Sequence, residues 1–347
     1  MKSDRILQNL LSKINKYLTR DDVSEIILHE IGIVRLDTTK GFKEIKDPNI
    51  TFQFLEDLPD QLATFSEQQF NHKFILLSSN IPNTSHRVTG VHRSCLLSNC
   101  NTILIRKPLG IEFKLEDYIN DNKGVEILEK NNELEEKIKY LEKTIHKLKE
   151  EQKPTSHLEV ELVINLVKVG KNILIVGGTG TAKTSFLNQL IKYIDLSTRI
   201  VAIQDSAELI IPQKNKEEIM VSKNSSNLSK LTYRGAIDIS MRLRPDRIFL
   251  GEIDTENTMA FLRLGNTGHK GMLSTLHTDH PNDTLNSLQL NLLLAGFTSE
   301  KDTLNAFIKS ALDYVIKIER VGFNRKVMAI KSINEIIKEE SEVNHAV

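Results

Sequence analysis

The stretch "NILIVGGTGTAKTSFLNQLI", residues 172–191, decides how this sequence is interpreted, because it joins an apolar run to a glycine-rich turn. Residues 173–176 are a continuous aliphatic run, which is typical of a strand buried in a parallel sheet. Beyond the turn, apolar residues recur at helical spacing, at Phe186, Leu187, Leu190, Ile191 and Ile194. A strand before such a turn and a helix after it are the flanks that a phosphate-binding loop requires.

The turn departs from the usual phosphate-loop pattern at one position. That pattern is glycine, four residues, then glycine, lysine and serine or threonine, and Ala182 stands where the second glycine is expected. We expect helical backbone angles at this junction, so that the extra methyl group is tolerated and nucleotide affinity survives. The alternative is a glycine-rich turn with an incidental lysine. The predicted nucleotide-binding residues are Gly177, Gly178, Thr179, Gly180, Thr181, Ala182, Lys183, Thr184 and Ser185.

The residue types in the loop suit a nucleoside triphosphate. Glycines let successive backbone N–H groups face a phosphate, and the helix that follows directs its N-terminus toward the same anion. Lys183 brings positive charge to the β and γ phosphates, and Thr184 can ligate magnesium. The sequence therefore predicts ATP and Mg²⁺ as ligands.

Composition limits the other function classes. The 347 residues are 39% hydrophobic and 27% charged, which is typical of a folded chain, and Lys+Arg and Asp+Glu both total 46. This balance gives no global attraction to nucleic acid or to an anionic membrane. Cys95 and Cys100 fit neither a disulfide framework nor a zinc site. Without a signal peptide or a run of about 18 apolar residues, we expect a cytoplasmic protein whose membrane contact is peripheral or through partners.

The chain has three predicted parts. Residues 1–124 alternate short apolar runs with polar turns and predict a small N-terminal α+β domain. Residues 125–153 predict a heptad helix that connects the domains. Residues 154–347 alternate strand-like runs with helical patterns, which is typical of a parallel α/β sheet. The predicted fold class is therefore α/β.

The connecting helix carries a seam with coiled-coil spacing. Its apolar residues recur at alternating steps of four and three, which places Asn131, Ile138 and Ile145 at a and Leu134, Leu141 and Leu148 at d. This choice of residues favours two-stranded pairing between chains. About three heptads are short for an independent coiled coil, so a single amphipathic helix that lies on its own domain is an equal alternative.

A second block of motifs follows the loop by some fifty residues. It reads "SMRLRPDRIFLGEIDTENTMAFLRLGNTGHKGMLSTLHTDHPND", residues 240–283. This block resembles the secretion-motor ATPases, and above all the hexameric traffic ATPase of bacterial type IV secretion systems. The resemblance extends to "VAIQDSAEL" (201–209), "SHRVTGVH" (85–92) and "ILIRKP" (103–108), and so covers nearly the whole chain outside the heptad segment.

The resemblance implies an architecture and a role. It implies a RecA-like P-loop ATPase domain with a smaller N-terminal domain, assembled as a homo-oligomeric ring of six, with ATP and magnesium bound between the two domains. Hydrolysis would change the relative orientation of the domains and drive secretion or pilus-subunit handling at the inner membrane. The implied partners are inner-membrane components of a secretion system.

Acidic residues at two predicted strand ends are candidates for catalysis and metal binding. The apolar run 248–250 delivers Glu252 to the phosphate loop, where its carboxylate could orient the attacking water or hold magnesium through water. The alternative is a solvated surface glutamate. Gly251 stands where many such enzymes have a magnesium-binding aspartate, so Asp205 or Glu208 must help, and Glu208 is the better match. The predicted metal ligands are Thr184, Asp205, Glu208 and Glu252, some of them through water.

His277 follows another predicted strand, where an imidazole could sense the γ phosphate or couple to a neighbouring subunit. A lone histidine is usually structural, and we assign His269 a turn or packing role. The resemblance to the secretion-motor ATPases is the reason why His277 is included among the candidate catalytic residues. Two residues depart from the family pattern, because Gln204 replaces a commonly acidic residue and Asp254 replaces an arginine.

Phosphoryl transfer also needs positive charge near the departing phosphate, and motors often take it from an arginine of another domain or subunit. Arg87 and Arg106 occupy the places of two such arginines in the family's first domain. The alternative is that both are ordinary surface arginines. Weaker candidates lie near the second motif block, at Arg242, Arg244 and Arg247.

The predicted function is therefore an ATP-hydrolysing ring motor that powers type IV secretion. One alternative is a type II secretion or type IV pilus motor, although the zinc-binding tetracysteine insertion of several such motors cannot be built from two cysteines. A second alternative is a nucleotide-binding scaffold that no longer hydrolyses, suggested by Ala182, Gln204 and Asp254. DNA translocation is not supported, because the sequence has neither a basic stripe nor aromatic residues placed to stack on bases.

Overall fold

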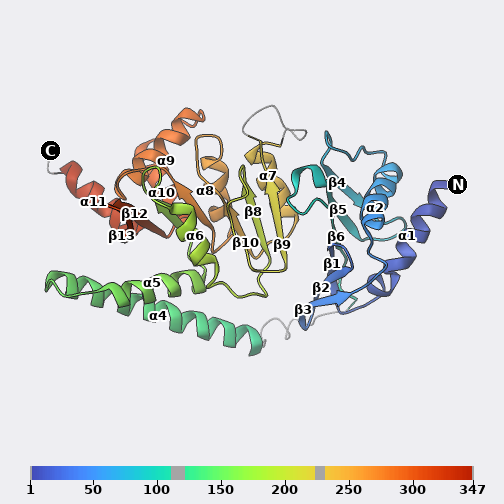
Figure 1. Ribbon diagram of the computed structural model, residues 1–347, viewed down its shortest axis with the longest axis horizontal. Coiled ribbons are helices and arrows are strands. Elements are labelled where there is room, and N and C mark those ends of the chain that lie inside the picture. Colours follow the sequence, from blue (N-terminus) through green and yellow to red (C-terminus); the bar gives the residue numbers. More distant parts are fainter. Residues whose placement is uncertain (1, 111–121, 223–230, 346–347) are drawn as a thin grey trace. The chain divides into compact units, whose positions relative to one another are not determined.

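The computed structural model describes residues 2–110, 122–222 and 231–345. The chain divides into two compact units, shown in Figure 1. The first comprises Met1–Ile119 with Glu217–Arg244, and the second comprises Asn120–Lys216 with Pro245–Val347. Residues 111–121, at the predicted end of the N-terminal domain, lie outside the described residues.

The first unit is a six-stranded antiparallel sheet with strand order β3-β2-β1-β6-β5-β4. β9 begins at Lys216, one residue before the chain returns to the first unit at Glu217. The elements that the unit contributes are α1 (Lys2–Leu18), β1 (Val23–Glu30), β2 (Ile33–Thr38), β3 (Gly41–Lys46), α2 (Phe52–Phe65), β4 (Leu76–Asn80), β5 (Arg87–Val91), the 3-10 helix η1 (Arg93–Cys95), β6 (Thr102–Arg106), β9 (Lys216–Met220) and α7 (Tyr233–Arg242).

One face of this sheet forms the core of the unit with α1 and α2. Alternate residues of a strand point to opposite faces, and Ile26 and Leu28 of β1 pack in one apolar cluster with Ile14 of α1 and Leu58 of α2. The residues between them, such as Glu25, point to the opposite face. Over residues 2–110, the alternating apolar and polar pattern thus corresponds to a sheet with two helices on one side.

The segment that begins at Glu217 belongs to the first unit, and its first residues lie against the other face of the sheet. Glu217 is 1% exposed, and a buried carboxylate is costly unless it is paired. Thr102 Oγ1 donates to Glu217, and His29 Nδ1 lies 3.4 Å from Glu217 Oε2. Leu97 N also donates to Glu218 O at 2.9 Å. The compact units therefore divide the chain differently from the sequence-based boundary at residue 154, which assigned this segment to the ATPase domain.

The second unit is a mostly parallel sheet whose strands follow the order β13-β12-β7-β11-β10-β8, with β12 and β13 antiparallel. Its elements are α4 (Asn122–Glu150), α5 (Ser156–Val169), β7 (Ile173–Val176), α6 (Lys183–Ile191), β8 (Ile200–Gln204), β10 (Arg247–Leu250), α8 (Thr258–Asn266), β11 (Leu273–Leu276), α9 (Asp283–Leu294), α10 (Lys301–Ala311), β12 (Tyr314–Val321), β13 (Asn324–Ser332) and α11 (Ile333–His345).

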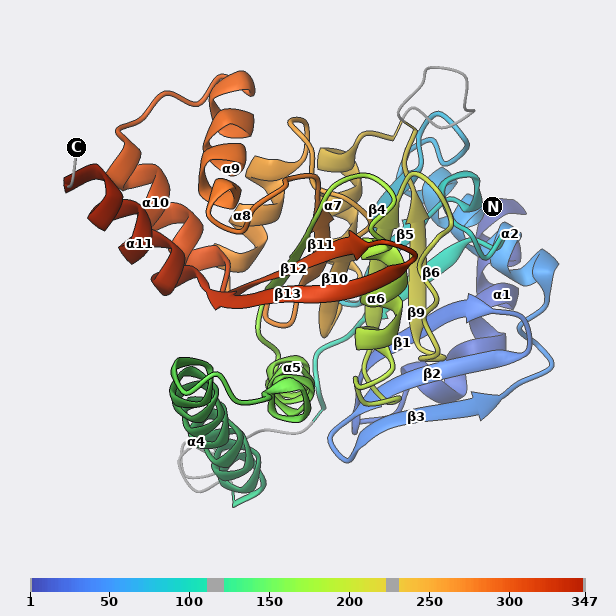
Figure 2. The same cartoon turned by 60° about the vertical axis from the view of Figure 1, so that its left-hand side comes forward.

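Helices cover both faces of this sheet, as a parallel sheet requires. The helices α4 and α5 lie on one side, and α8, α9 and α10 lie on the other (Figures 1 and 2). Leu166 of α5 and Leu187 of α6 share an apolar core with Ile175 of β7 and Phe249 of β10. The strand and the helix predicted around the glycine-rich turn are β7 and α6.

The central part of the heptad seam of α4 is buried inside the second unit. Ile138 and Leu141 are each 2% exposed, and Ile145 is 7% exposed. All three join the core cluster that contains Leu162 and Leu166 of α5. The packing corresponds to the alternative of an amphipathic helix on its own domain, because side chains in this core have little surface left for a second helix.

Ile138→Asp is expected to destabilise the second unit by about 3–5 kcal/mol, the cost of an uncompensated buried charge. Tyr140→Asp is the matched control, because Tyr140 lies on the same helix and is 67% exposed, so its replacement should change stability by less than about 0.5 kcal/mol. Urea unfolding followed by circular dichroism measures both. If Ile138→Asp kept its stability but lost oligomer mass, the seam would pair between chains instead.

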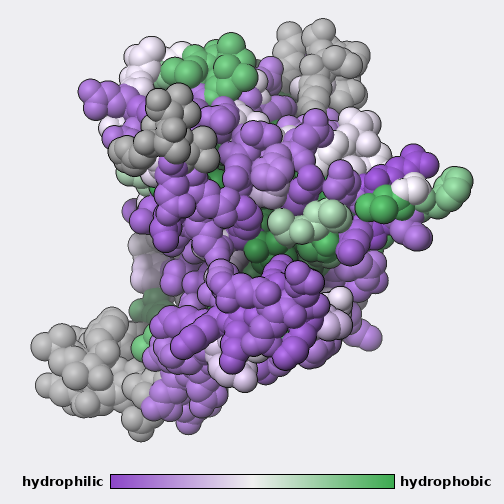
Figure 3. All heavy atoms as spheres, turned by 90° about the vertical axis from the view of Figure 1, so that its left-hand side faces the viewer, coloured by the Kyte–Doolittle hydropathy of each residue, from purple (hydrophilic) through white to green (hydrophobic). Residues whose placement is uncertain are grey.

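No helix in the described part of the chain is both long and apolar enough to cross a bilayer. The face shown in Figure 3 is mostly hydrophilic, and its hydrophobic side chains gather in small, separate groups.

Candidate active site

A cavity of about 480 Å³ lies at the carboxyl ends of β7, β8, β10 and β11, the edge at which parallel α/β sheets bind their ligands. It brings together ten of the predicted site residues: Thr179, Gly180, Ala182, Lys183, Thr184, Ser185, Asp205, Glu208, Glu252 and His277. The rest of its lining is Gln204, Ser206, Gly251 and Thr275. The lining residues all belong to the second unit.

The glycine-rich loop curls tightly between β7 and α6. Gly177 has φ of +157°, and a Cβ at this position would lie 2.3 Å from Ile318 O. Thr181 Oγ1 closes the loop by donating to Gly178 O at 2.9 Å. A side chain at residue 177 would therefore displace the loop. The loop leads directly into the N-terminus of α6, the kind of position at which backbone N–H groups bind phosphate.

The expectation of helical angles at Ala182 is wrong. Ala182 is the N-cap of α6 and has φ of 68° and ψ of 37°, which is the left-handed conformation. This conformation costs an L-residue roughly 1–2 kcal/mol because its Cβ approaches the following carbonyl oxygen. The glycine of the usual pattern avoids that cost, and the preference for glycine was the signal in the sequence that the angle is unusual.

Ala182→Gly is therefore expected to stabilise the chain by about 1 kcal/mol and to leave hydrolysis within about tenfold of the original rate, or about 1.4 kcal/mol in the barrier. Ala182→Val should do the opposite, because a β-branched residue is poorly tolerated at positive φ. Scanning calorimetry of the three chains measures the order of stability. A gain in turnover of many orders of magnitude in the glycine variant would show that the natural alanine disables the site.

Lys183 is held inside the loop by backbone oxygens. Its ammonium donates to Gly177 O at 2.9 Å and to Gly178 O at 3.0 Å, and the residue is 7% exposed. Burial lowers the pKa of Lys183, while the charges of Glu252 and Asp279 act in the opposite direction. An arriving triphosphate would supply further negative charge to this ammonium and favour its charged form. Nothing in the sequence indicated that Asp279 contributes to the site, apart from its position two residues after His277.

His277 bridges Lys183 and Glu252. Its Nδ1 lies 3.2 Å from Lys183 Nζ, and its Nε2 lies 3.3 Å from Glu252 Oε1. An ammonium can only donate, so Nδ1 accepts, and the ring proton sits on Nε2 and faces the carboxylate. The three residues form a continuous polar chain from the phosphate loop to the end of β10. Displacement of Lys183 by a phosphate would leave Nδ1 open to a new partner.

Gln204 shapes the acidic turn that carries Glu208. The residue is 1% exposed, and its Oε1 accepts from Glu208 N and Leu209 N, both at 3.0 Å. Asn188 of α6 supports the same turn, because its Nδ2 donates to Glu208 O at 2.9 Å and its Oδ1 accepts from Ile210 N at 2.8 Å. A glutamine oxygen serves this acceptor role as well as a glutamate oxygen would. The departure at residue 204 therefore keeps the geometry of the turn.

The second departure, Asp254, organises the turn after Glu252. Its Oδ1 accepts from Glu256 N at 3.0 Å and from Asn257 N at 3.2 Å. Asn257 Nδ2 in turn donates to Glu252 O at 3.0 Å. These bonds fix the backbone of the carboxylate-bearing segment just before α8. Gly251 is explained by packing, because a Cβ there would lie 3.3 Å from Gln204 Cβ.

The remaining candidates lie outside the cavity lining. The main chain of His269 bonds to Leu264 and to Asn172, and burial lowers the pKa of its ring, which fits a turn or packing role. Arg247 Nη1 donates to Val167 O at 2.8 Å, at the end of α5. Four other predicted arginines belong to the first unit: Arg87, Arg106, Arg242 and Arg244.

The residues present suit magnesium in its usual form. Among the described residues, no group of three or more His, Cys, Asp or Glu side chains is placed to hold a metal by itself. Magnesium commonly binds through one or two carboxylates together with substrate phosphates and water. Thr184, Asp205, Glu208 and Glu252 line one cavity with the phosphate loop, so the protein would supply a few ligands and the triphosphate the others.

Comparison with known proteins places the chain among secretion system proteins. It is 28% identical to the type IV secretion system protein VirB11 of Bartonella henselae, over 94% of this chain and 92% of that protein. The VirB11 of Bartonella quintana is also 28% identical, with the same coverage. The crystal structure of the VirB11 ATPase from the Brucella suis type IV secretion system in complex with sulphate covers 98% of both chains, with a TM-score of 0.80 and 20% identity.

The family model of the type II/IV secretion system protein matches residues 138–340, which is more than half of the chain. These comparisons confirm the predicted α/β fold and the resemblance to type IV secretion ATPases. The chain is a member of the type II/IV secretion system protein family.

Proposed function

We propose that this protein is the ATPase of a type IV secretion system and hydrolyses MgATP in the cavity at the carboxyl edge of the second unit's sheet. The supporting observation is the convergence of the phosphate-loop lysine with Glu252, Glu208 and His277 on that cavity. The relatives that match over nearly the full chain are type IV secretion proteins, which favours this system over a type II secretion or pilus motor.

Each residue has a distinct role in the proposed reaction. Lys183 neutralises the β and γ phosphates, and the backbone N–H groups at the start of α6 bind the same oxygens. Glu252 orients the attacking water and accepts its proton. His277, which contacts both Lys183 and Glu252, senses the γ phosphate when the lysine moves onto it. The turn carrying Asp205 and Glu208 completes the acidic side of the cavity.

Magnesium would be held by Thr184, with Asp205, Glu208 and Glu252 acting directly or through water, and it would stabilise the charge that develops on the phosphates. Arg87 and Arg106 of the first unit supply further positive charge to the departing γ phosphate. We propose that six chains form a ring in the cytoplasm, where it contacts secretion components at the inner membrane. The family relationship supports these assignments.

The purified chain is expected to release phosphate from ATP only with a divalent cation, so an excess of EDTA should stop the reaction. Lys183→Ala is the control and should weaken ATP binding by about 100-fold, or about 2.7 kcal/mol, because the loop loses its charged phosphate contact. Phosphate release and equilibrium ATP binding measure these effects. If the unaltered chain bound ATP but released no more phosphate than Lys183→Ala, the protein would be a nucleotide-binding scaffold instead.

A further inference from the structure

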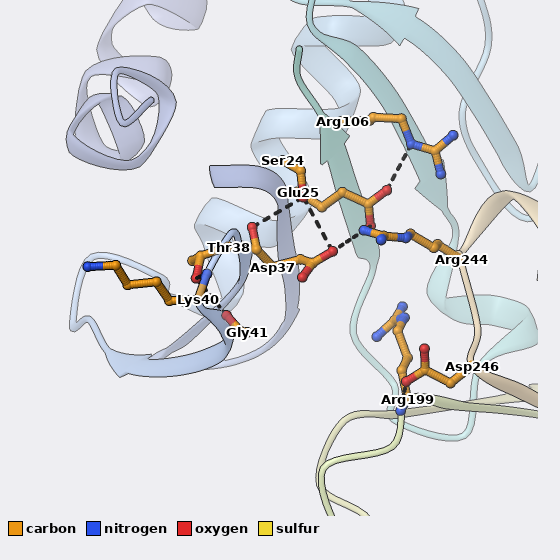
Figure 4. A network of polar contacts seen from close by, with 10 residues as sticks. All are labelled: Ser24, Glu25, Asp37, Thr38, Lys40, Gly41, Arg106, Arg199, Arg244 and Asp246. Atoms are coloured by element: carbon orange, nitrogen blue, oxygen red, sulfur yellow. Dashed lines mark hydrogen bonds and ion pairs between the residues drawn. The ribbon is translucent and has the colours of Figure 1, made fainter. Parts of the chain in front are cut away.

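A buried carboxylate lies between two arginines on one face of the first unit's sheet. Glu25 of β1 is 3% exposed, whereas the side chains of Arg106 and Arg244 are 52% and 50% exposed. Arg106 Nε donates to Glu25 Oε1 at 2.8 Å, and Arg244 Nη1 lies 3.4 Å from Glu25 Oε2. Arg244 also donates to Asp37, whose carboxylate accepts from Ser24 Oγ at 3.3 Å. Figure 4 shows these contacts.

The strand register brings Arg87 to the same place. Glu25 of β1 is paired with Arg106 of β6, and Arg106 is paired with Arg87 of β5. Directly opposite residues of an antiparallel pair share a face, with Cβ atoms about 4.5–5.5 Å apart. Like charges in that relation repel each other. Glu25 supplies the negative charge that makes this arrangement of two arginines tolerable.

The contacts of Arg106 leave its outer nitrogens available. A guanidinium has five N–H donors in a rigid plane, and only Nε is used here, because neither terminal nitrogen has a hydrogen bond within the described residues. Figure 4 marks a contact from Glu25 to Nε of Arg106 and none to either terminal nitrogen. This edge of the fork is the one that matches two oxygens of a phosphate. Arg244, by contrast, directs one nitrogen to two carboxylates.

We propose that Glu25 is a positioning residue for phosphoryl transfer: it holds Arg106 by Nε and leaves the outer N–H pair available to bind a phosphate, while Arg244, which also binds Asp37, holds Glu25. This inference rests on the proposed function, in which Arg106 contacts the phosphates. It assigns different roles to Arg106 and Arg87, the two arginines predicted from the sequence. The buried carboxylate of Glu25 holds the Arg106 side chain, whereas the Arg87 side chain has no hydrogen bond or ion pair within the described residues.

Glu25→Gln keeps the size of the side chain and removes its charge. In the full-length protein with MgATP, it should lower kcat and kcat/KM together by about 10- to 100-fold, the scale of a misplaced catalytic group. The same change in a chain that already carries Arg106→Ala should have little effect, because the group to be positioned is gone. Asp22→Asn is the matched control, since it removes another arginine–carboxylate pair of this unit, to Arg20, and should leave hydrolysis unchanged.

An equal loss in both backgrounds would overturn the inference, because Glu25 would then act independently of Arg106. Full activity of Arg106→Ala alone would instead remove the proposed phosphate contact and the inference with it. The two failures are therefore distinguishable. Oligomer mass and the thermal midpoint of each variant show whether the fold is retained.

Lysine variants test the same idea without altering Glu25. Arg106→Lys keeps the charge but has a single nitrogen, which cannot both bind Glu25 and present a fork to phosphate, so it should be nearly as impaired as Arg106→Ala. Arg87→Lys should retain much more activity, because no hydrogen bond or ion pair to another described residue orients that side chain. Parental activity of Arg106→Lys would overturn the positioning role even if Glu25→Gln did not fold.

Discussion

A chain carrying Glu252→Gln is expected to bind ATP normally and to release phosphate about 10²–10⁴-fold more slowly than the unaltered chain, the usual contribution of a general base. Glutamine keeps an oxygen that can accept from His277 Nε2, now 3.3 Å from Glu252 Oε1, so the local arrangement should persist. The lost charge removes the proton acceptor for the attacking water. Single-turnover hydrolysis and equilibrium nucleotide binding separate the two effects.

Glu256→Gln is the matched control for this prediction, because it makes the same charge change four residues away at an exposed position. It should hydrolyse ATP at the parental rate. If Glu252→Gln also did so, Glu252 could not be the catalytic carboxylate. Glu208, which lines the same cavity, would then take that role, and Glu208→Gln would show the large loss.

Arg106→Ala is expected to lower hydrolysis by roughly 10³–10⁵-fold, the effect that an arginine at the transferred phosphate has in other motors. Arg87→Ala should act in the same direction. Stability should change far less, because the Arg106 side chain is 52% exposed and Glu25 keeps its contact with Arg244. Phosphate release and thermal unfolding, measured on the same preparations, test the contrast. Arg263→Ala, at an exposed position of α8, controls for the loss of one positive charge.

Mixed assemblies decide whether the arginine acts within one chain or between chains. Arg106→Ala and Glu252→Gln chains are each expected to be nearly inactive by themselves. If the arginine acts on a neighbouring subunit, mixing the two chains rebuilds some intact sites and restores part of the activity. No recovery would favour action within one chain, and full activity of both single arginine variants would remove the role altogether.

Much of the candidate site could be predicted because its residues follow apolar runs along the chain. In a parallel sheet, the residues just after each strand meet at one edge, so Lys183, Glu252 and His277 were expected together and do line one cavity. The contribution of Asn188 could not be foreseen, because it lies inside α6 and meets the turn at Glu208 only when the unit is folded. Gln204 was noticed as a departure, but its acceptor role toward two backbone N–H groups is a property of the turn's shape.

The parallel α/β sheet, the phosphate loop between β7 and α6, and the family could be predicted from the sequence alone, because they depend on residue types at short, regular spacings. The left-handed angle of Ala182, the burial of Ile138, Leu141 and Ile145 of α4 against α5, and the return of the chain to the first unit at Glu217 became known only from the folded structure. It also brought Glu25 to Arg106, 81 residues away in the chain. These features arise from contacts between segments that lie far apart in the chain. The local sequence pattern permits several arrangements, and the burial of apolar side chains and the pairing of buried charges favour one of them.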